Sequence, residues 1–227
     1  FETFAKDKVQ YPFGYGLSYT TFEKEIVSSS TDNGKISVQV KVTNTGAISG
    51  KDTVQLYYSA PYTGKIEKSA IVLGGFDKTK LLAPGESETL TVEYNVNDMA
   101  SYDWLGTEAW VLEKGDYEII LGENAREHID SFIYTIDTDI IIKNDSVTGT
   151  EIKNLFDEAY SGYTILSRAN PEKTYPSARA LVKTDDIKDA DKYPSPTKNG
   201  SAPEMGVVYD TGVITLQDVY EDESLME

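Results

Sequence analysis

Alternation of apolar and polar residues with a period of two is the feature that most constrains the fold of this chain. From Ile36 to Val42 every second residue is apolar, and similar stripes follow at 54–58 and 90–94. Successive side chains of a strand point to opposite faces of a sheet, so each stripe predicts a strand with one buried face. This pattern is typical of antiparallel sheets that cover a core on one side.

Turn signals separate these stripes. Asp32-Asn33-Gly34 precedes the first stripe and Pro84-Gly85 precedes the third, and both sequences favour tight chain reversals. Gly74-Gly75 predicts a β-bulge. Further strands are expected from Phe22 onward and at 71–76, 110–112, 117–121 and 132–136. Roughly seven or eight short strands, without alternating helices, predict a mainly β protein with an antiparallel β-sandwich.

The inward side chains of these strands give a predicted core. The expected core residues are Val38, Val40, Val42, Val54, Leu56, Leu73, Phe76, Leu90, Val92, Trp110, Tyr117, Ile119 and Leu121. A sandwich of about 110 residues is large enough to fold on its own.

The stretch Tyr11–Phe22 has a different character. It combines two glycines and one proline with several aromatic residues. Such a run predicts an irregular connector, because it needs special backbone angles and large apolar contacts together. A connector of this kind normally joins two folded bodies. We therefore expect the connector to join the strands that follow it to another folded body.

The pattern changes again after residue 137. Ile140–Ile142 is compatible with one more strand, and Thr148–Glu151 resembles a capping box followed by apolar residues at helical spacing. One short helix of about ten residues is expected there. Residues 138–227 are otherwise predicted to form a long, irregular C-terminal arm. The residues that interrupt it are Pro171, Pro176, Pro194, Pro196 and Pro203.

The first part of the chain resembles the fibronectin-type-III-like domain of family-three glycoside hydrolases, the β-glucosidases and their relatives. The matching blocks, in the same order, are Tyr11–Phe22, Val42–Gly46, Gly50–Tyr57, Leu73–Lys78, Leu82–Glu86, Gly115–Glu118 and Leu121–Gly122. In that family the first block joins an α/β-sandwich domain to the fibronectin-like domain, so the resemblance implies that residues 1–18 are the tail and connector of a preceding α/β-sandwich domain. The resemblance implies an immunoglobulin- or fibronectin-III-like sandwich for residues 19–137.

The arm has a resemblance of its own. Gly149–Asp157 and Thr164–Asn170 are similar to the connector of permuted family members, and Gly212–Val219 is similar to the lead into their catalytic barrel. The implied domain order is α/β-sandwich, fibronectin-like domain, then barrel. Residues 138–227 would then be a linker arm leading toward the barrel. The implied partners are these missing catalytic domains of the same enzyme.

No catalytic residue is assigned. Glycoside hydrolysis needs two carboxyl groups, but 38 acidic residues single out no pair, and the family's catalytic motifs match no position here. Asp103-Trp104 is interpreted as a strand or turn pair. His128 is the only histidine and cysteine is absent, so neither a nucleophile–histidine site nor a metal site is expected, and no cofactor is implied.

Three residues are candidates for contact with a β-glycoside at a domain seam. Tyr57 and Tyr58 are adjacent in a strand, so one of them faces outward, and an outward ring near Tyr62 could line a sugar site. Tyr58 and Tyr62 are therefore substrate-binding candidates, unless these rings pack against the missing domains. Arg168 is a candidate for a charge-assisted contact across the seam.

The net charge of −17 disfavours nucleic acid and anionic membranes as partners. Lack of cysteine leaves the compartment open, with the cytoplasm slightly favoured over secretion. The resulting hypothesis is a non-catalytic accessory domain of a bacterial β-glucosidase-like enzyme of carbohydrate metabolism. It holds the catalytic domains in register and hydrolyses nothing alone. The alternatives are a carbohydrate-binding module and an adhesion or dimerisation β-sandwich.

Overall fold

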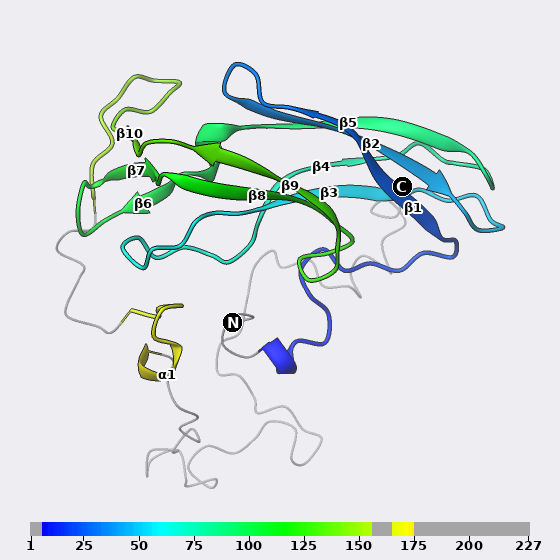
Figure 1. Cartoon of the computed structure of the whole chain (residues 1–227). Coiled ribbons are helices and arrows are strands. Elements are labelled where there is room, and N and C mark those ends of the chain that lie inside the picture. Colours follow the sequence, from blue (N-terminus) through cyan, green and yellow to red (C-terminus); the bar gives the residue numbers. More distant parts are fainter. Residues whose placement is uncertain (1–5, 156–164, 175–227) are drawn as a thin grey trace, which may run out of the picture. The chain divides into compact units, whose positions relative to one another are not determined.

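Two antiparallel β-sheets pack face to face, and a third, smaller sheet lies at one end (Figure 1). The structure is a computed structural model that describes residues 6–155 and 165–174. The first sheet has the order β1-β2-β5 and the second β4-β3-β8-β9, while the small sheet has the order β10-β7-β6. This arrangement confirms the predicted mainly β sandwich.

The strands are short, as the sequence predicted. Their bounds are β1 Phe22–Ser30, β2 Lys35–Asn44, β3 Thr53–Ser59, β4 Val72–Lys78, β5 Ser87–Asn95, β6 Ser101–Asp103, β7 Ala109–Leu112, β8 Gly115–Gly122, β9 His128–Ile136 and β10 Ile140–Ile142. The helical elements are the 3-10 turns η1 Lys6–Lys8 and η2 Val96–Met99 and the helix α1 Pro171–Thr174. None of these helices is long or apolar enough to cross a membrane.

The two predicted turns have the expected backbone. Asn33 and Gly34 both have positive φ, 53° and 73°, and the Lys35 N–H donates to the Asp32 carbonyl at 3.0 Å. Two consecutive positive φ values are the geometry of the turn that best matches strand twist in a hairpin. The Pro84-Gly85 turn is also confirmed, with Gly85 at φ 78°.

The core lies between the two large sheets. Its fully buried members include Ile36, Val38, Val40, Val42, Val54, Leu56, Leu82, Leu112, Tyr117, Ile119 and Leu121. Leu73 and Leu90, which the sequence also placed in the core, are half-buried. Most of the predicted core is therefore confirmed.

Two predicted core residues are wrong. Phe76 is 67% exposed and Trp110 is 43% exposed. The register of β3 with β4 shifts at the predicted bulge, and Gly75 faces the core, where an added Cβ would come within 2.9 Å of Val92. Alternation then places Phe76 on the outer face. Alternation also places Trp110 on the outer face of the small sheet, because its neighbours Ala109 and Val111 take the buried positions.

The expected helix after Thr148 is absent from residues 148–155, and residues 156–164 lie outside the described part. The Asp145 carboxylate accepts from the backbone N–H groups of Val147 and Thr148 at 3.1 and 2.7 Å, which stabilises a turn instead of a helix. The short helix of the arm is α1, which begins at Pro171. Proline is favoured at the first position of a helix because its missing N–H has no intrahelical partner there.

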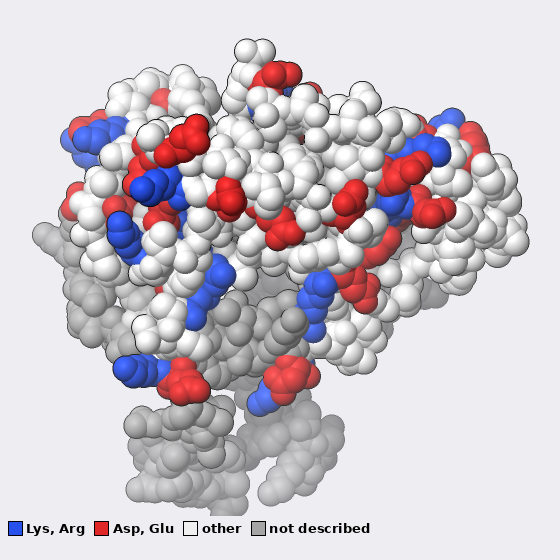
Figure 2. Space-filling view, viewed as in Figure 1, with Lys and Arg blue, Asp and Glu red and all other residues white. Residues whose placement is uncertain are grey.

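Acidic and basic side chains are interspersed on the face shown in Figure 2. In the described part of the chain some charged side chains pair across neighbouring strands, such as Lys41 with Glu25 at 2.8 Å and Lys35 with Glu93 at 3.5 Å. Exposed pairs of this kind add little stability. On this face the excess negative charge is thus distributed rather than gathered into one field.

Candidate interaction surfaces

The connector is held on the outer face of β3 through its backbone. The Gln55 side-chain amide donates to the Gly14 carbonyl at 3.0 Å, and its oxygen accepts from the Tyr57 hydroxyl at 2.7 Å. The Ala125 N–H donates to the Phe13 carbonyl at 2.9 Å. Two side chains of one strand and one loop amide therefore fix the path of the connector.

Glycine is required at one point of this contact. Gly14 has φ +82°, a conformation that side-chain-bearing residues rarely adopt, and a Cβ there would collide with the side-chain oxygens of Gln55 and Tyr57. The connector can lie this close to β3 only because position 14 carries no side chain.

The C-terminal end of the connector is fixed by a buried asparagine of β2. The Asn44 carbonyl oxygen accepts from the Thr20 hydroxyl at 2.7 Å and from the Gly46 N–H at 3.1 Å. Its amide group donates to the Leu82 carbonyl at 2.9 Å. A fully buried amide with its donors and acceptors satisfied positions the backbone segments around it.

The large apolar side chains of the connector are exposed to solvent. Every second residue from 11 to 19 is a large apolar residue that remains exposed, up to 89% for Leu17 and 97% for Tyr19. The members of this set, which we call the connector surface, are Tyr11, Phe13, Tyr15, Leu17 and Tyr19. Exposed apolar residues gathered in this way are typical of interaction surfaces.

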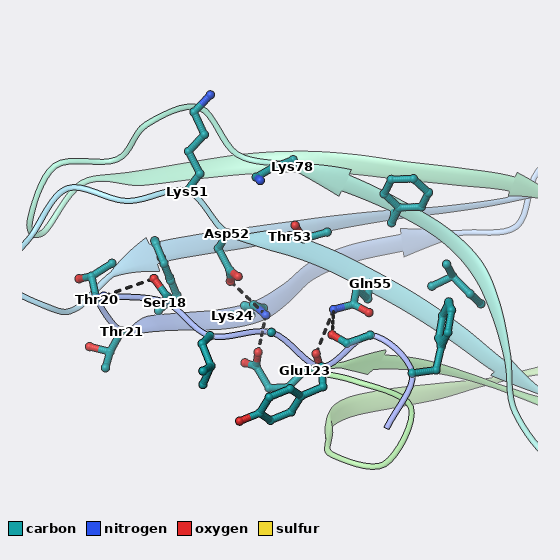
Figure 3. Close-up of a pocket in the computed structure, with 18 residues that line it drawn as sticks. Ser18, Thr20, Thr21, Lys24, Lys51, Asp52, Thr53, Gln55, Lys78 and Glu123 are labelled. Carbon is teal, nitrogen blue, oxygen red and sulfur yellow. Dashed lines mark hydrogen bonds and ion pairs between the residues drawn. The ribbon is translucent and has the colours of Figure 1, made fainter. Parts of the chain in front are cut away.

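A cleft of about 700 Å³ is lined by residues of the connector, β3 and β4 (Figure 3). At its base the Lys24 ammonium lies 3.0 Å from the Asp52 carboxylate and 2.6 Å from that of Glu123. The Lys24 side chain is only 1% exposed, and a buried charge is tolerated only when it is paired. Because Lys24 occupies the space between the two carboxylates, this cleft does not present an acid and nucleophile pair to a sugar.

A second contact joins the segment 165–174 to the loop after β3. The Arg168 guanidinium lies over the Tyr62 ring, 4.3 Å from its centroid. Glu67 accepts from the Tyr62 hydroxyl at 2.7 Å and from the Arg168 N–H at 2.9 Å. The Ala169 N–H donates to the Tyr62 hydroxyl at 3.1 Å. We call this group, Tyr62, Glu67 and Arg168, the arm joint.

Opposing effects act on the pKa of Glu67 in the arm joint. Burial raises this pKa, but hydrogen bonds from the Arg168 N–H, Tyr62 and Ser167, together with the charge of Arg168, lower it. The net result is a pKa below the usual value for glutamate. The arm joint therefore contains an ionised carboxylate that accepts hydrogen bonds from Tyr62 of the loop and from Arg168 of the arm segment.

The loop that carries Tyr62 and Glu67 is itself anchored to the sandwich. Lys68 forms a buried ion pair with Glu113, which also accepts from the Thr63 hydroxyl at 2.7 Å. The Tyr117 hydroxyl of β8 donates to the Glu113 carbonyl at 3.1 Å. A loop anchored to a core strand gives the arm joint a fixed base.

The structure brings together two of the three substrate-binding candidates and separates the third. Tyr62 and Arg168 meet in the arm joint. Tyr58 instead faces the core, where it stacks on Tyr94 with ring centroids 6.3 Å apart. Its outward neighbour Tyr57 is also buried, because the connector covers that face of β3. The two adjacent tyrosines therefore face opposite sides of β3 as predicted, but the outward ring is covered and does not line an open site.

Other sequence candidates have local roles. Asp103 accepts from the N–H groups of Gly106 and Thr107 at 3.0 and 2.8 Å, so it stabilises the turn after β6. His128 begins β9 on the surface. Within residues 6–155 and 165–174, no group of three or more His, Asp or Glu side chains could hold a metal ion.

Sequence reasoning missed the residues that hold the contacts, namely Lys24, Gln55 and Glu67. Gln55 lies inside the block Gly50–Tyr57, but a polar residue on the outer face of a strand is usually exposed to solvent and not a binding residue. No short-range signal connects it with Gly14.

These features define a β-sandwich whose described chain ends are both held on its surface. Residues 52–125 match the fibronectin type III-like domain, so this part of the chain is such a domain. The relatives and solved structures that the chain resembles are β-glucosidases. The predicted resemblance to the fibronectin-type-III-like domain of family-three glycoside hydrolases is therefore confirmed.

The relatives are much longer than this chain. Beta-glucosidase A of Butyrivibrio fibrisolvens is 48% identical over 164 residues, which cover 63% of this chain and 20% of that protein. A beta-glucosidase of Ruminococcus albus is 46% identical over 147 residues, 63% of this chain and 15% of that protein. The crystal structure of a beta-glucosidase from Paenibacillus barengoltzii matches with a TM-score of 0.59 and 44% identity over 62% of this chain and 17% of that one.

Proposed function

We propose that this chain is a non-catalytic scaffold of a β-glucosidase-like enzyme that hydrolyses β-glycosides with retention. The sandwich holds an α/β-sandwich domain that precedes it and a barrel that follows it in register. The observation that carries this proposal is that β3 and the loop after it contact both the connector, which enters the sandwich, and the arm segment 165–174, which follows it. Gln55 and Tyr57 of β3 bind the connector, and Tyr62 binds Arg168 of the arm.

The position of β3 makes this arrangement stiff. It pairs with β4 on one side and β8 on the other, so its backbone is hydrogen-bonded along both edges. Its inward residues Val54 and Leu56 are fully buried. A strand fixed in this way cannot shift without disrupting the core, so the segments held on its outer face and on the loop after it keep a constant separation.

Register matters for an enzyme whose active site forms between domains. A misplacement of about 1 Å can cost about 100-fold in rate, since reacting groups must approach within a narrow range of distance and angle. A scaffold therefore contributes to catalysis without touching substrate. In this proposal residues 1–18 end the preceding domain, 19–137 form the scaffold and 138–227 lead to the barrel.

The proposal is tested in two parts. The chain alone is incubated with an aryl β-glucoside and is expected to release no aryl alcohol. In the second part, this chain replaces the matching segment of the Butyrivibrio fibrisolvens relative. The resulting chimaera is expected to hydrolyse the same aryl β-glucoside. Gly14→Ala and Arg168→Met should each lower its kcat/KM, whereas Lys41→Met, which breaks only the exposed pair with Glu25 outside both contacts, should not.

Two results would contradict the scaffold role. The first is turnover by the isolated chain above the buffer rate. The second is an active chimaera whose kcat/KM is unchanged by both Gly14→Ala and Arg168→Met.

A further inference from the structure

The outer face of the small sheet carries aromatic side chains that the scaffold role does not use. In the strand register Trp110 of β7 is opposite Tyr102 of β6 and Ile142 of β10, so the three side chains lie in one row across the sheet. The Tyr102 ring packs edge-on against the indole, with centroids 5.6 Å apart. This contact orients the indole of Trp110, which is 43% exposed.

A groove of about 310 Å³ opens beside this indole. Its apolar lining consists of Ala100, Trp110, Ile142 and Ile152. Polar side chains come from both sides of the small sheet. Asn97 and Asp98 belong to η2, while Asn144 and Asp145 follow β10.

Local hydrogen bonds hold the two carboxylates in place. Asp98 accepts from the backbone and side-chain N–H groups of Asn95 at 3.3 and 3.1 Å. Asp145 accepts from the Thr148 N–H at 2.7 Å and from the Thr148 hydroxyl at 2.8 Å. Each of these contacts leaves acceptor capacity on the carboxylate, which has about four lone-pair positions.

This lining selects a ligand class. Among the described residues of the groove there is no lysine or arginine, and two carboxylates would repel an anion. A wholly apolar ligand would cover these carboxylates without offering them a donor, at a free-energy cost. A neutral ring with an apolar face and hydroxyl groups at its edge complements both the apolar and the acidic lining of the groove. Its face stacks on the indole, and its hydroxyl groups donate hydrogen bonds to the carboxylates.

We propose that this Trp110 groove binds one neutral pyranose ring of a saccharide. Its volume lies at the lower end of the range for small-molecule sites, which begins at about 300 Å³, so it suits one ring rather than a long chain. The proposal is independent of the scaffold role, since neither the connector surface nor the arm joint contributes to the groove.

The test uses the full 227-residue chain with cellobiose as the probe. The chain has two tryptophans, so the two indole N–H signals in an NMR spectrum can be assigned with Trp104→Phe. Cellobiose should shift the Trp110 signal saturably, with a Kd on the order of 1 mM, and leave the Trp104 signal in place. Glucose 6-phosphate, an anion, should shift it much less.

Variants then separate stacking from fold. Trp110→Ala should weaken cellobiose binding about tenfold or more in calorimetry, and Trp110→Tyr should retain part of it. Trp104→Phe should bind as the unaltered chain does. Because the NMR measurement needs no change at Trp110, misfolding of Trp110→Ala cannot obscure the outcome. An unshifted Trp110 signal, or equal binding of glucose 6-phosphate, would overturn the proposal.

Discussion

The guanidinium of Arg168 lies 4.3 Å from the centroid of the Tyr62 ring, which joins a segment beyond the sandwich to the loop that follows its central strand. Glu67 accepts hydrogen bonds from both residues, so the contact combines stacking with a charged acceptor. Arginine suits this position because its flat group stacks on a ring while its N–H groups remain available. Here one of them donates to the Lys68 carbonyl at 3.1 Å.

Removing this stack should loosen the arm without unfolding the sandwich. Arg168→Met and Tyr62→Leu should each increase hydrogen exchange at residues 165–174. The double variant should reveal a coupling free energy of about 0.5–1 kcal/mol. Lys173→Met is the matched control, since Lys173 is an exposed cation of the same segment outside the joint. Additive effects of the two changes would argue against the stack.

Acid should release the arm joint through Glu67. The pKa of Glu67 in the folded chain is below its ordinary value of 4.5. Its ionised form therefore stabilises the docked segment fully above about pH 4.5, and this contribution is lost as pH falls through the lower, folded value. The amide NMR signals of Arg168 and Ala169 should titrate in that acidic range. Glu67→Gln should abolish this titration and reduce the hydrogen-exchange protection of residues 165–174 at neutral pH. If the Arg168 and Ala169 signals of this variant still titrate, a group other than Glu67 causes the titration.

Replacing the connector glycine should detach the connector from β3. Gly14→Ala adds a methyl group that meets the Gln55 and Tyr57 oxygens, at a residue with φ +82°. We expect a loss of about 1–3 kcal/mol in the free energy of unfolding, together with faster proteolysis between residues 8 and 20. Gly16→Ala is the control, because nothing lies within 4 Å of its added Cβ. Equal proteolysis of the two variants would show that Gly14 does not fix the connector.

The buried ammonium beneath the connector should be far more important than an exposed one. Lys24→Met removes the partner of both Asp52 and Glu123 and should lower the free energy of unfolding by about 3–5 kcal/mol, since an unpaired charge remains partly buried. Lys41→Met breaks the exposed pair with Glu25 and should leave the urea midpoint almost unchanged. Similar midpoints for the two variants would contradict this ranking.

The sequence by itself determined the strands and their turns. The alternation from Ile36 to Val42 and the Asn33-Gly34 turn are local signals, and β2 and its hairpin follow them closely. Alternation identifies two faces of a strand, but it does not say what covers the outer one. Phe76 was therefore placed in the core, although the bulge at Gly74-Gly75 turns it outward.

Only the tertiary structure decided which outer faces became contacts. Tyr57 is buried because the connector crosses it, and Arg168 meets Tyr62 because the chain returns to the loop after β3. Such contacts join residues that are far apart in the sequence, and their register depends on the packing of whole sheets. Short-range periodicity carries no record of that packing, so Gln55, Lys24 and Glu67 gained their roles only from the folded arrangement.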